Sequence, residues 1–75
     1  MAVYLITGIG GFIGSSLARA LLSRGEQVRG VDNFSTGNRE NISEILDRID
    51  FRKADILDLG AMHKACAGVD FVLHQ

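Results

Sequence analysis

Residues 7–14 read Thr7-Gly8-Ile9-Gly10-Gly11-Phe12-Ile13-Gly14, a glycine-rich segment between two apolar segments of different periodicity. Residues 2–7 form a short apolar run of strand-forming residues, and from Phe12 onward the apolar residues recur at helical spacing. Glycine at a strand-to-helix junction permits a tight turn and a close approach of the backbone to a phosphate. The segment therefore predicts a phosphate-binding turn at the N-terminus of a helix.

Three glycines of this segment, Gly8, Gly11 and Gly14, follow the spacing G-x-x-G-x-x-G. The related spacing G-x-G-x-x-G begins with Gly8 and Gly10 but fails at its third glycine, because position 13 is isoleucine. Many glycine patterns of this kind are only structural turns. A second feature is needed before the pattern indicates a binding site.

The second feature is Asp32, which follows Gly8 by 24 residues and ends a predicted strand at 27–32. This separation is close to the ~20 residues at which an acidic side chain reaches the adenosine ribose of a dinucleotide. A carboxylate accepts hydrogen bonds from ribose hydroxyls and repels a 2′-phosphate, so Asp32 favours NAD over NADP. The alternative interpretation is that Asp32 only forms a turn with Asn33.

The apolar pattern predicts alternating strands and helices along the whole chain. The helix that starts at Phe12 carries Ile13, Leu17 and Leu21 at a spacing of four and ends at Gly25. A polar loop at 33–38 then leads to a second helix.

The second half of the chain continues this alternation. A short charged strand is predicted at 51–55, at an edge of the sheet. Asp58 is expected to cap a third helix that ends at Gly68, and 71–73 form a last apolar strand. The residues on the apolar faces are Ile42, Ile45, Leu46 and Ile49 in the second helix and Leu59, Met62, Ala65 and Cys66 in the third.

This order of elements predicts an α/β fold with a Rossmann-like, doubly wound parallel sheet of four strands and three helices. The right-handed crossover rule favours the strand order 3-2-1-4. Residues 1–75 then form one partial nucleotide-binding domain, since a chain this short has little core to spare for a second lobe. The apolar fourth strand lies uncovered at an edge, so we expect self-association there.

Composition excludes several classes of function. Of the 75 residues, 47% are hydrophobic, 23% are charged and none is proline, which excludes disorder. The net charge of -1 provides no basic surface for nucleic acid or an anionic membrane, and no apolar run approaches the ~18 residues of a membrane span. The single cysteine, Cys66, is interpreted as a small core residue without a disulfide or metal partner, which indicates a cytoplasmic protein.

Four segments carry a resemblance to a known family. They are Thr-Gly-x-x-Gly-Phe-Ile-Gly at 7–14, Val-Asp-Asn-Phe-Ser-Thr-Gly at 31–37, Ala-Asp-Ile at 54–56 and Gly-Val-Asp-Phe-Val-Leu-His-Gln at 68–75. Together they resemble the start of the extended short-chain dehydrogenase/reductase family. Within it the chain is most similar to NAD-dependent nucleotide-sugar epimerases and dehydratases, particularly UDP-hexose and UDP-N-acetylhexosamine 4-epimerases. The whole chain is covered, as the N-terminal portion of such an enzyme.

The resemblance implies roles for individual residues in binding NAD. It places the glycine-rich turn at the pyrophosphate, Asp32 and the loop after it at the adenosine ribose, and the pair at 55–56 at the adenine ring. Asp55 has the alternative of simply ending a strand. The implied cofactor-binding residues are Gly8, Gly11, Phe12, Ile13, Gly14, Asp32, Asn33, Phe34, Ser35, Thr36, Gly37, Asp55 and Ile56, with no metal ligand among them.

Catalysis in this family rests on a Tyr-x-x-x-Lys pair with a serine or threonine. The only tyrosine here, Tyr4, is followed four positions later by Gly8, so no catalytic residue is expected. The implied parent reaction is epimerisation at C4 of a UDP-sugar, with hydride removed and returned through NAD. Two alternatives stay open, namely a stand-alone nucleotide-binding module and another doubly wound binder such as a methyltransferase.

Overall fold

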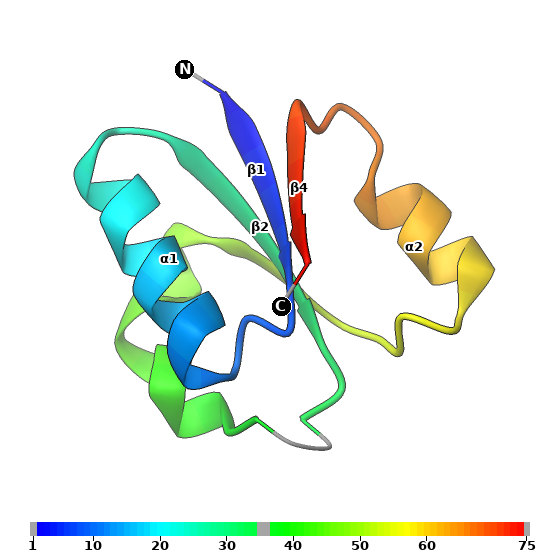
Figure 1. The fold of residues 1–75 in the computed structure, drawn as a ribbon, viewed down its shortest axis with the longest axis horizontal. Helices are drawn as coiled ribbons and strands as arrows, with labels where there is room; N and C mark the ends of the chain where they lie inside the picture. Colours follow the sequence, from blue (N-terminus) through cyan, green and yellow to red (C-terminus); the bar gives the residue numbers. More distant parts are fainter. Residues whose placement is uncertain (1, 35–36, 75) are drawn as a thin grey trace.

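The computed structural model describes residues 2–34 and 37–74, which form alternating strands and helices (Figure 1). The elements in chain order are β1 (Val3–Thr7), α1 (Phe12–Ser23), β2 (Gln27–Asp32), the 3₁₀ helix η1 (Arg39–Arg48), β3 (Asp50–Lys53), α2 (Leu59–Ala65) and β4 (Phe71–His74). None of the helices in these two ranges has the length and hydropathy that a membrane crossing requires.

The four strands form one parallel sheet in the order β3-β2-β1-β4, which confirms the predicted Rossmann-like arrangement. Thr7, the last residue of β1, pairs with Val31 of β2 and with His74 of β4. The carboxyl ends of these three strands therefore meet at the same edge of the sheet. Doubly wound proteins bind their ligands at this edge.

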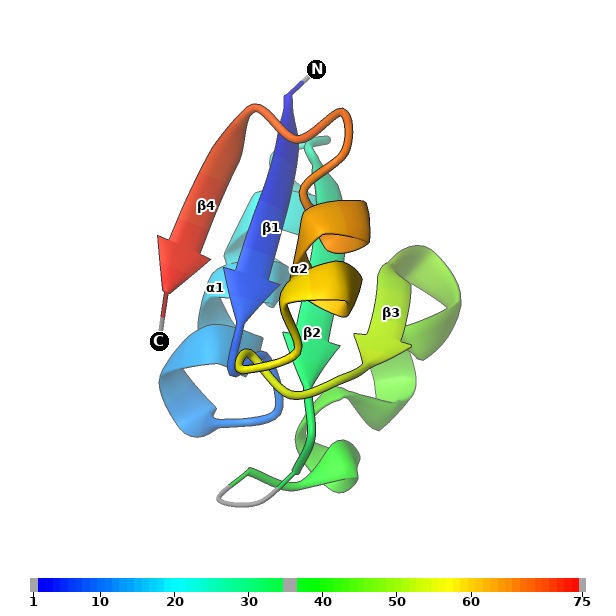
Figure 2. The same cartoon turned by 90° about the vertical axis from the view of Figure 1, so that its right-hand side faces the viewer.

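Helices cover both faces of the sheet (Figures 1 and 2). In Figure 1, α1 lies on one side of the strands and α2 on the other. The larger core, on the side of α1 and η1, contains Ile6, Ile9, Ala18, Leu21, Val28, Ile42 and Ile45. The smaller core, on the side of α2, contains Leu5, Val31 and Ala65.

α1 forms where the sequence predicts it and ends before Gly25, whose φ of +80° suits the glycine expected there. It buries Ser15, Ala18 and Leu21. The expectation that Ile13 shares this apolar face is wrong, because 66% of its surface is exposed. Ile13 belongs to the first turn of α1, which borders a pocket rather than the sheet.

The second predicted helix is the 3₁₀ helix η1. Side chains three residues apart lie on the same side of a 3₁₀ helix, so Ile42 and Ile45 are both buried against α1 and the sheet. Leu46 and Ile49 are partly buried against the same core. The apolar positions were therefore predicted correctly, although their spacing did not distinguish the type of helix.

α2 begins at the predicted cap, where the Asp58 carboxylate accepts a hydrogen bond from the first turn. Ala65 is buried and Met62 packs partly buried beside it, but Leu59 and Cys66 are exposed. The prediction that Cys66 is a core residue is therefore wrong. Successive helical residues point about 100° apart, so the residue after the buried Ala65 faces away from the sheet.

The two edges of the sheet differ in character. β3, at one edge, carries the charged residues Asp50, Arg52 and Lys53, as predicted for an edge strand. β4, at the other edge, has no such charges on its first residues, and Phe71 and Val72 are 52% and 53% exposed. The β4 edge is therefore the apolar one.

The glycine-rich turn is anchored to the sheet by Ile9, whose side chain is fully buried. A Cβ added to Gly30 of β2 would lie 2.5 Å from Ile9 Cδ1 and 2.9 Å from its Cγ2. The absence of a side chain at position 30 therefore leaves room for the Ile9 side chain. This packing fixes the position of the glycine-rich turn relative to the sheet.

We predict that Gly30→Ala lowers the free energy of unfolding by about 1–3 kcal/mol, because the added methyl group overlaps a side chain that has no room to move. Ile9→Val removes the nearest atom, so the double variant Gly30→Ala/Ile9→Val should be more stable than the sum of the two single changes predicts. Urea unfolding of the four proteins measures this coupling. Strictly additive changes would contradict the packing argument.

Candidate functional site

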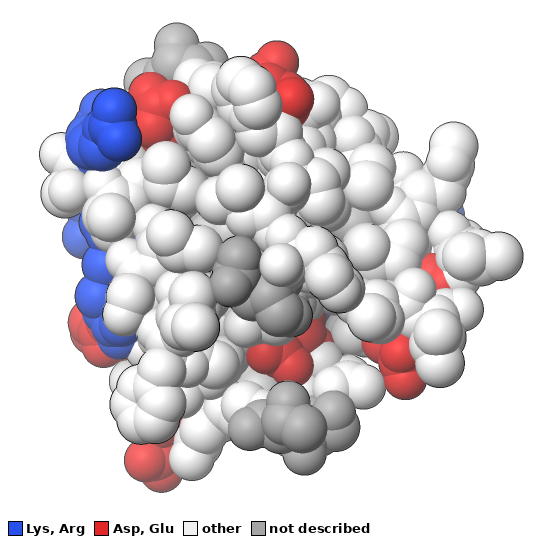
Figure 3. Space-filling model, in the orientation of Figure 1, with Lys and Arg blue, Asp and Glu red and all other residues white. Residues whose placement is uncertain are grey.

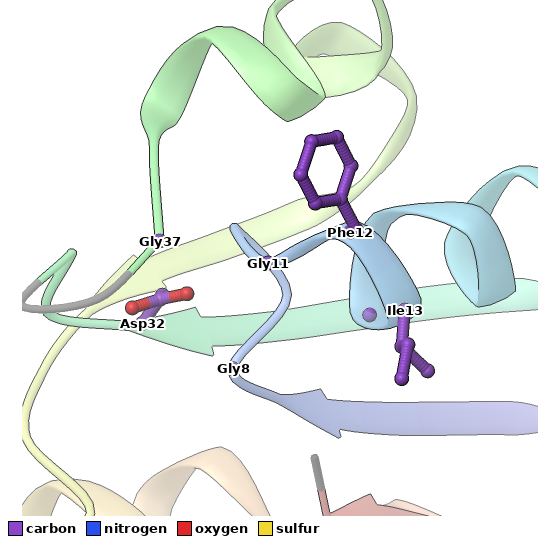
Figure 4. A pocket seen from close by; sticks show the side chains of 7 residues that line it. Gly8, Gly11, Phe12, Ile13, Asp32 and Gly37 are labelled. Atoms are coloured by element: carbon purple, nitrogen blue, oxygen red, sulfur yellow. The ribbon is translucent and has the colours of Figure 1, made fainter.

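A pocket of about 300 Å³ lies at the carboxyl edge of the sheet, between the glycine-rich turn, the start of α1 and the end of β2 (Figure 4). This volume is at the lower end of the range for small-molecule sites, and it suits part of a nucleotide rather than a whole dinucleotide. The residues that line it are Gly8, Gly11, Phe12, Ile13, Gly14, Asp32 and Gly37. All seven were predicted from the sequence as site residues.

The turn from Gly8 to Gly11 is closed by backbone hydrogen bonds. Gly8 has a φ of +71°, which favours glycine, and its N–H donates to the Val31 carbonyl at 2.8 Å. The Gly11 N–H donates back to the Gly8 carbonyl at 3.1 Å. A Cβ on Gly14 would overlap the Gly8 carbonyl and lie 2.9 Å from Ile9 Cα, so glycine at position 14 lets α1 start directly against the turn.

α1 begins at the pocket with its N-terminus open. Its N-cap, Gly11, provides no side-chain hydrogen bond, and its first turn contains no acidic residue. Phe12 and Ile13 flank this end with exposed side chains, which Figure 4 shows projecting from the start of the helix. The first-turn N–H groups and the helix dipole therefore favour an anion in the pocket.

Asp32 is the only charged residue among the seven that line the pocket. In the face that Figure 3 shows, the basic side chains lie along the edge beside α1, and the rest of this face is mainly uncharged. The lining residues include no lysine or arginine. A bound phosphate would therefore be held by backbone N–H groups rather than by cationic side chains.

The Asp32 side chain is nearly buried, with 8% of the residue's surface exposed, and both its oxygens accept backbone hydrogen bonds. Oδ2 accepts from the Gly10 N–H at 2.7 Å, and Oδ1 accepts from the Phe34 N–H at 2.7 Å. Asp32 therefore joins the turn before α1 to the loop after β2. Each oxygen keeps a further lone pair for a ligand hydroxyl.

The loop after β2 contributes less to the pocket than predicted. Phe34, at a φ of +61°, packs against the larger core and stacks on Phe51 with ring centroids 5.4 Å apart, and it does not line the pocket. Gly37 does line it, and a Cβ there would lie 2.7 Å from the carbonyl carbon of Gly10. The predicted residues Ser35 and Thr36 lie outside the described residues.

The other three predicted residues lie beside the pocket and not in its lining. Asn33 and Asp55 are exposed, and Asn33 Nδ2 donates to Asp55 Oδ2 at 3.3 Å. Ile56 follows in the connection between β3 and α2 and is exposed. This hydrogen bond joins the loop after β2 to the loop after β3. The three residues therefore lie in neighbouring loops at the carboxyl edge of the sheet.

Sequence reasoning left out two residues that hold the turn in place, Gly10 within it and Asn41 in η1. Gly10 donates its N–H to Asp32, and its carbonyl accepts a hydrogen bond from Asn41 Nδ2 at 2.6 Å. The Gly8-x-Gly10 spacing is a signal for Gly10, although the G-x-G-x-x-G pattern that it begins is incomplete. No sequence pattern indicated Asn41, because η1 and the glycine-rich turn come together only in the folded chain.

At the strand ends beside the turn, Thr7 Oγ1 and His74 Nδ1 are 2.7 Å apart and share a hydrogen bond. Thr7 is buried at the end of β1, so this contact ties β4 to the centre of the sheet. Within residues 2–34 and 37–74, no group of three histidine, cysteine, aspartate or glutamate side chains could hold a metal ion.

Comparison with known proteins gives consistent matches. The model of the NAD dependent epimerase/dehydratase family matches residues 4–75. The UDP-glucose 4-epimerase of Mycolicibacterium smegmatis is 48% identical over 56 residues, which are 72% of this chain and 18% of that protein. The UDP-N-acetyl-alpha-D-glucosaminuronate decarboxylase of Bacillus cytotoxicus is 43% identical over 70 residues, which are 93% of this chain and 22% of that protein.

A solved structure shares the fold. The Bordetella bronchiseptica enzyme WbmH, in complex with NAD+, superposes with a TM-score of 0.91 at 38% identity, covering 100% of this chain and 25% of that one. The chain thus spans about a fifth of the length of these two curated relatives. The two relatives are named for different reactions, an epimerisation and a decarboxylation.

We predict that Gly10→Ala lowers the free energy of unfolding by about 1–3 kcal/mol, because its Cβ would lie 2.8 Å from Asp32 Oδ2 and 2.8 Å from the Phe34 ring. Gly60→Ala in α2 is the matched control, since its Cβ would meet Asp58 Oδ1 at an ordinary 3.6 Å. The control should unfold at the wild-type denaturant concentration or above it. Equal urea midpoints for Gly10→Ala and Gly60→Ala would contradict the close packing at the turn.

Proposed function

The chain belongs to the NAD-dependent epimerase/dehydratase family, and we propose that it binds the adenosine and pyrophosphate part of NAD in the pocket at the glycine-rich turn. The observation that supports this most strongly is the placement of Asp32 in the same pocket as the open N-terminus of α1. An anion site and a hydroxyl acceptor side by side match a pyrophosphate joined to a ribose.

The residues of the pocket fit this cofactor. The glycines leave space for a pyrophosphate against the first-turn N–H groups of α1, and the free lone pairs of Asp32 would accept hydrogen bonds from ribose hydroxyls. A 2′-phosphate would meet the Asp32 carboxylate without a lysine or arginine among the lining residues. The proposed cofactor is therefore NAD rather than NADP.

The adenine ring is proposed to lie over the loops after β2 and β3. Asn33, Asp55 and Ile56 stay proposed contacts of this ring or its ribose, supported by the hydrogen bond that joins the two loops. Phe34 is proposed to act through its backbone N–H and its core packing, since its ring supports the loop from below.

For a larger protein that contains this chain, we propose NAD-dependent epimerisation at C4 of a UDP-sugar, as in the UDP-glucose 4-epimerase relative. NAD supplies reversible hydride transfer to that chemistry. The 75-residue chain is proposed to bind without turnover, because its single tyrosine, Tyr4, lies in β1 and forms no Tyr-x-x-x-Lys pair. A cytoplasmic location also stays a prediction.

The ligand preference tests this proposal. In calorimetric titrations the chain should bind NAD more tightly than NADP, and S-adenosylmethionine should not bind measurably. The Asp32 carboxylate accepts from an unsubstituted ribose and repels a 2′-phosphate, which disfavours NADP. S-adenosylmethionine has an unsubstituted ribose but no pyrophosphate for the first-turn N–H groups of α1. Preferred binding of S-adenosylmethionine would instead support a methyltransferase-like binder and overturn the assignment.

Asp32→Asn should lower the NAD affinity roughly tenfold or more, because an uncharged amide replaces a charged acceptor of the ribose hydroxyls. Asp47→Asn removes the same charge from an exposed position of η1 and should leave the affinity within about twofold. Both variants are compared by calorimetry at a temperature where circular dichroism shows them folded. Equal affinities in the two variants would contradict the role of Asp32.

The uncovered edge of β4 supports a proposal about assembly. Its backbone has no neighbouring strand on one side among the described residues, and Phe71 and Val72 expose apolar surface there. We propose that two copies of the chain pair their β4 edges, because this joins two sheets and covers the apolar side chains. The charged β3 edge opposes such pairing at the other end of the sheet.

Val72→Lys should shift the chain from dimer to monomer in sedimentation equilibrium, because a lysine on an edge strand opposes strand pairing. Leu57→Lys is the matched control, since it places the same charge on a highly exposed apolar residue outside the sheet. The control should keep the wild-type mass. A monomeric wild-type chain at high concentration would overturn the assembly proposal.

A further inference from the structure

Both peptide groups of Gly10 are hydrogen bonded to other parts of the chain, one to the last residue of β2 and the other to residues between β2 and β3. The Gly10 N–H donates to Asp32 Oδ2 at 2.7 Å. The Gly10 carbonyl accepts from the Asn38 N–H at 3.0 Å and from Asn41 Nδ2 at 2.6 Å. Both lone pairs of this carbonyl oxygen therefore accept hydrogen bonds. No free lone pair of this oxygen is left to face an anion in the neighbouring pocket.

The direction of the Gly10 carbonyl also sets the direction of the next N–H. A peptide group is planar and trans, so the Gly10 C=O and the Gly11 N–H point in opposite directions. The Gly11 N–H donates to the Gly8 carbonyl and closes the turn. Holding the Gly10 carbonyl toward η1 thus holds Gly11, the N-cap of α1, where the helix starts.

Asn41 is in turn held by α1. Its backbone carbonyl accepts a hydrogen bond from the Arg19 guanidinium, and Arg19 Nε donates to Glu44 Oε1 at 2.6 Å. The hydrogen bond from the Arg19 guanidinium lowers the pKa of the Glu44 carboxyl. Asn41 therefore lies where η1, α1 and the glycine-rich turn meet, although it does not line the pocket.

We propose that Asn41 is a positioning residue for the pocket. Its side-chain amide holds the Gly10 carbonyl toward η1 and so keeps this carbonyl away from a pyrophosphate bound at the first-turn N–H groups of α1. The inference rests on the proposed NAD function and extends it to a residue outside the pocket. Asp32 and Asn41 then hold the peptides on the two sides of Gly10.

The test is a titration of the 75-residue chain with ADP, which carries the adenosine and pyrophosphate groups of NAD. Asn41→Ala should lower the ADP affinity roughly five- to tenfold, because one hydrogen bond is lost and a carbonyl lone pair is freed. Asn41→Asp is isosteric and should weaken binding further, since a carboxylate oxygen then faces the Gly10 oxygen. Titrations are run where thermal unfolding shows each variant at least ~95% folded, so that unfolding changes the apparent Kd by only about 5%.

Ser43→Ala is the matched control on the same 3₁₀ helix, because its exposed hydroxyl donates to the Glu40 carbonyl within that helix. It should bind ADP within about twofold of the wild type. Amide hydrogen exchange gives a local readout: in Asn41→Ala the Gly11 N–H should exchange faster, while that of Ile6 in β1 stays unchanged.

The outcomes separate this inference from the function on which it rests. If the wild type binds ADP and both Asn41 variants bind it within twofold, the positioning role is overturned. If the wild type does not bind ADP, the proposed function fails instead. In that case hydrogen exchange in Asn41→Ala tests the positioning role by itself. Unchanged exchange of the Gly11 N–H overturns this role, and faster exchange supports it.

Discussion

The carboxylate of Asp32 makes the hydrogen bonds on which the geometry of the pocket depends. One oxygen holds the Gly10 N–H and the other holds the Phe34 N–H, each at 2.7 Å. These bonds join the turn before α1 to the loop after β2, and the Asn38 N–H, which donates to the Gly10 carbonyl, joins the same two segments. Because hydrogen bonds to a charged acceptor contribute about 1.5–3 kcal/mol each, a single side chain at the end of β2 contributes strongly to the position of both loops.

Close packing between the glycine-rich turn and the sheet holds the Gly10 N–H in a fixed position for the Asp32 carboxylate. Ile9 fills the space that Gly30 leaves open in β2, and Gly14 lets α1 start against the Gly8 carbonyl. Close-packed buried side chains cannot move without a loss of free energy. The position of the turn relative to the sheet is therefore fixed before any ligand binds. The pocket is in this sense preformed, which reduces the ordering that binding would require.

Much of this arrangement could be predicted from the sequence because it depends on local rules. Strand and helix periodicity together with the right-handed crossover rule predicted the strand order, and glycine spacing with an acidic strand end predicted Gly8, Gly11, Gly14 and Asp32. The family resemblance implied the other three residues of the pocket lining, Phe12, Ile13 and Gly37. The errors concern residues whose position depends on tertiary packing. Cys66 is exposed because Ala65 takes the buried position on a short helix, and Ile13 is exposed because it lies in the first turn of α1 beside the pocket. No sequence spacing relates Asn41 to Gly10.

In the proposed function Asp32 both holds the turn and binds the ribose, and this double role constrains how the site could change its ligand. A residue suited to a 2′-phosphate would have to replace the carboxylate, and the N–H groups of Gly10 and Phe34 would then lose their acceptor in a nearly buried place. Ligand preference and the shape of the turn are thus coupled through one side chain. Asn41 is free of this coupling, because it holds the other peptide of Gly10 from outside the pocket. A change of cofactor would therefore need a second acceptor for those two N–H groups, supplied with the new side chain at position 32.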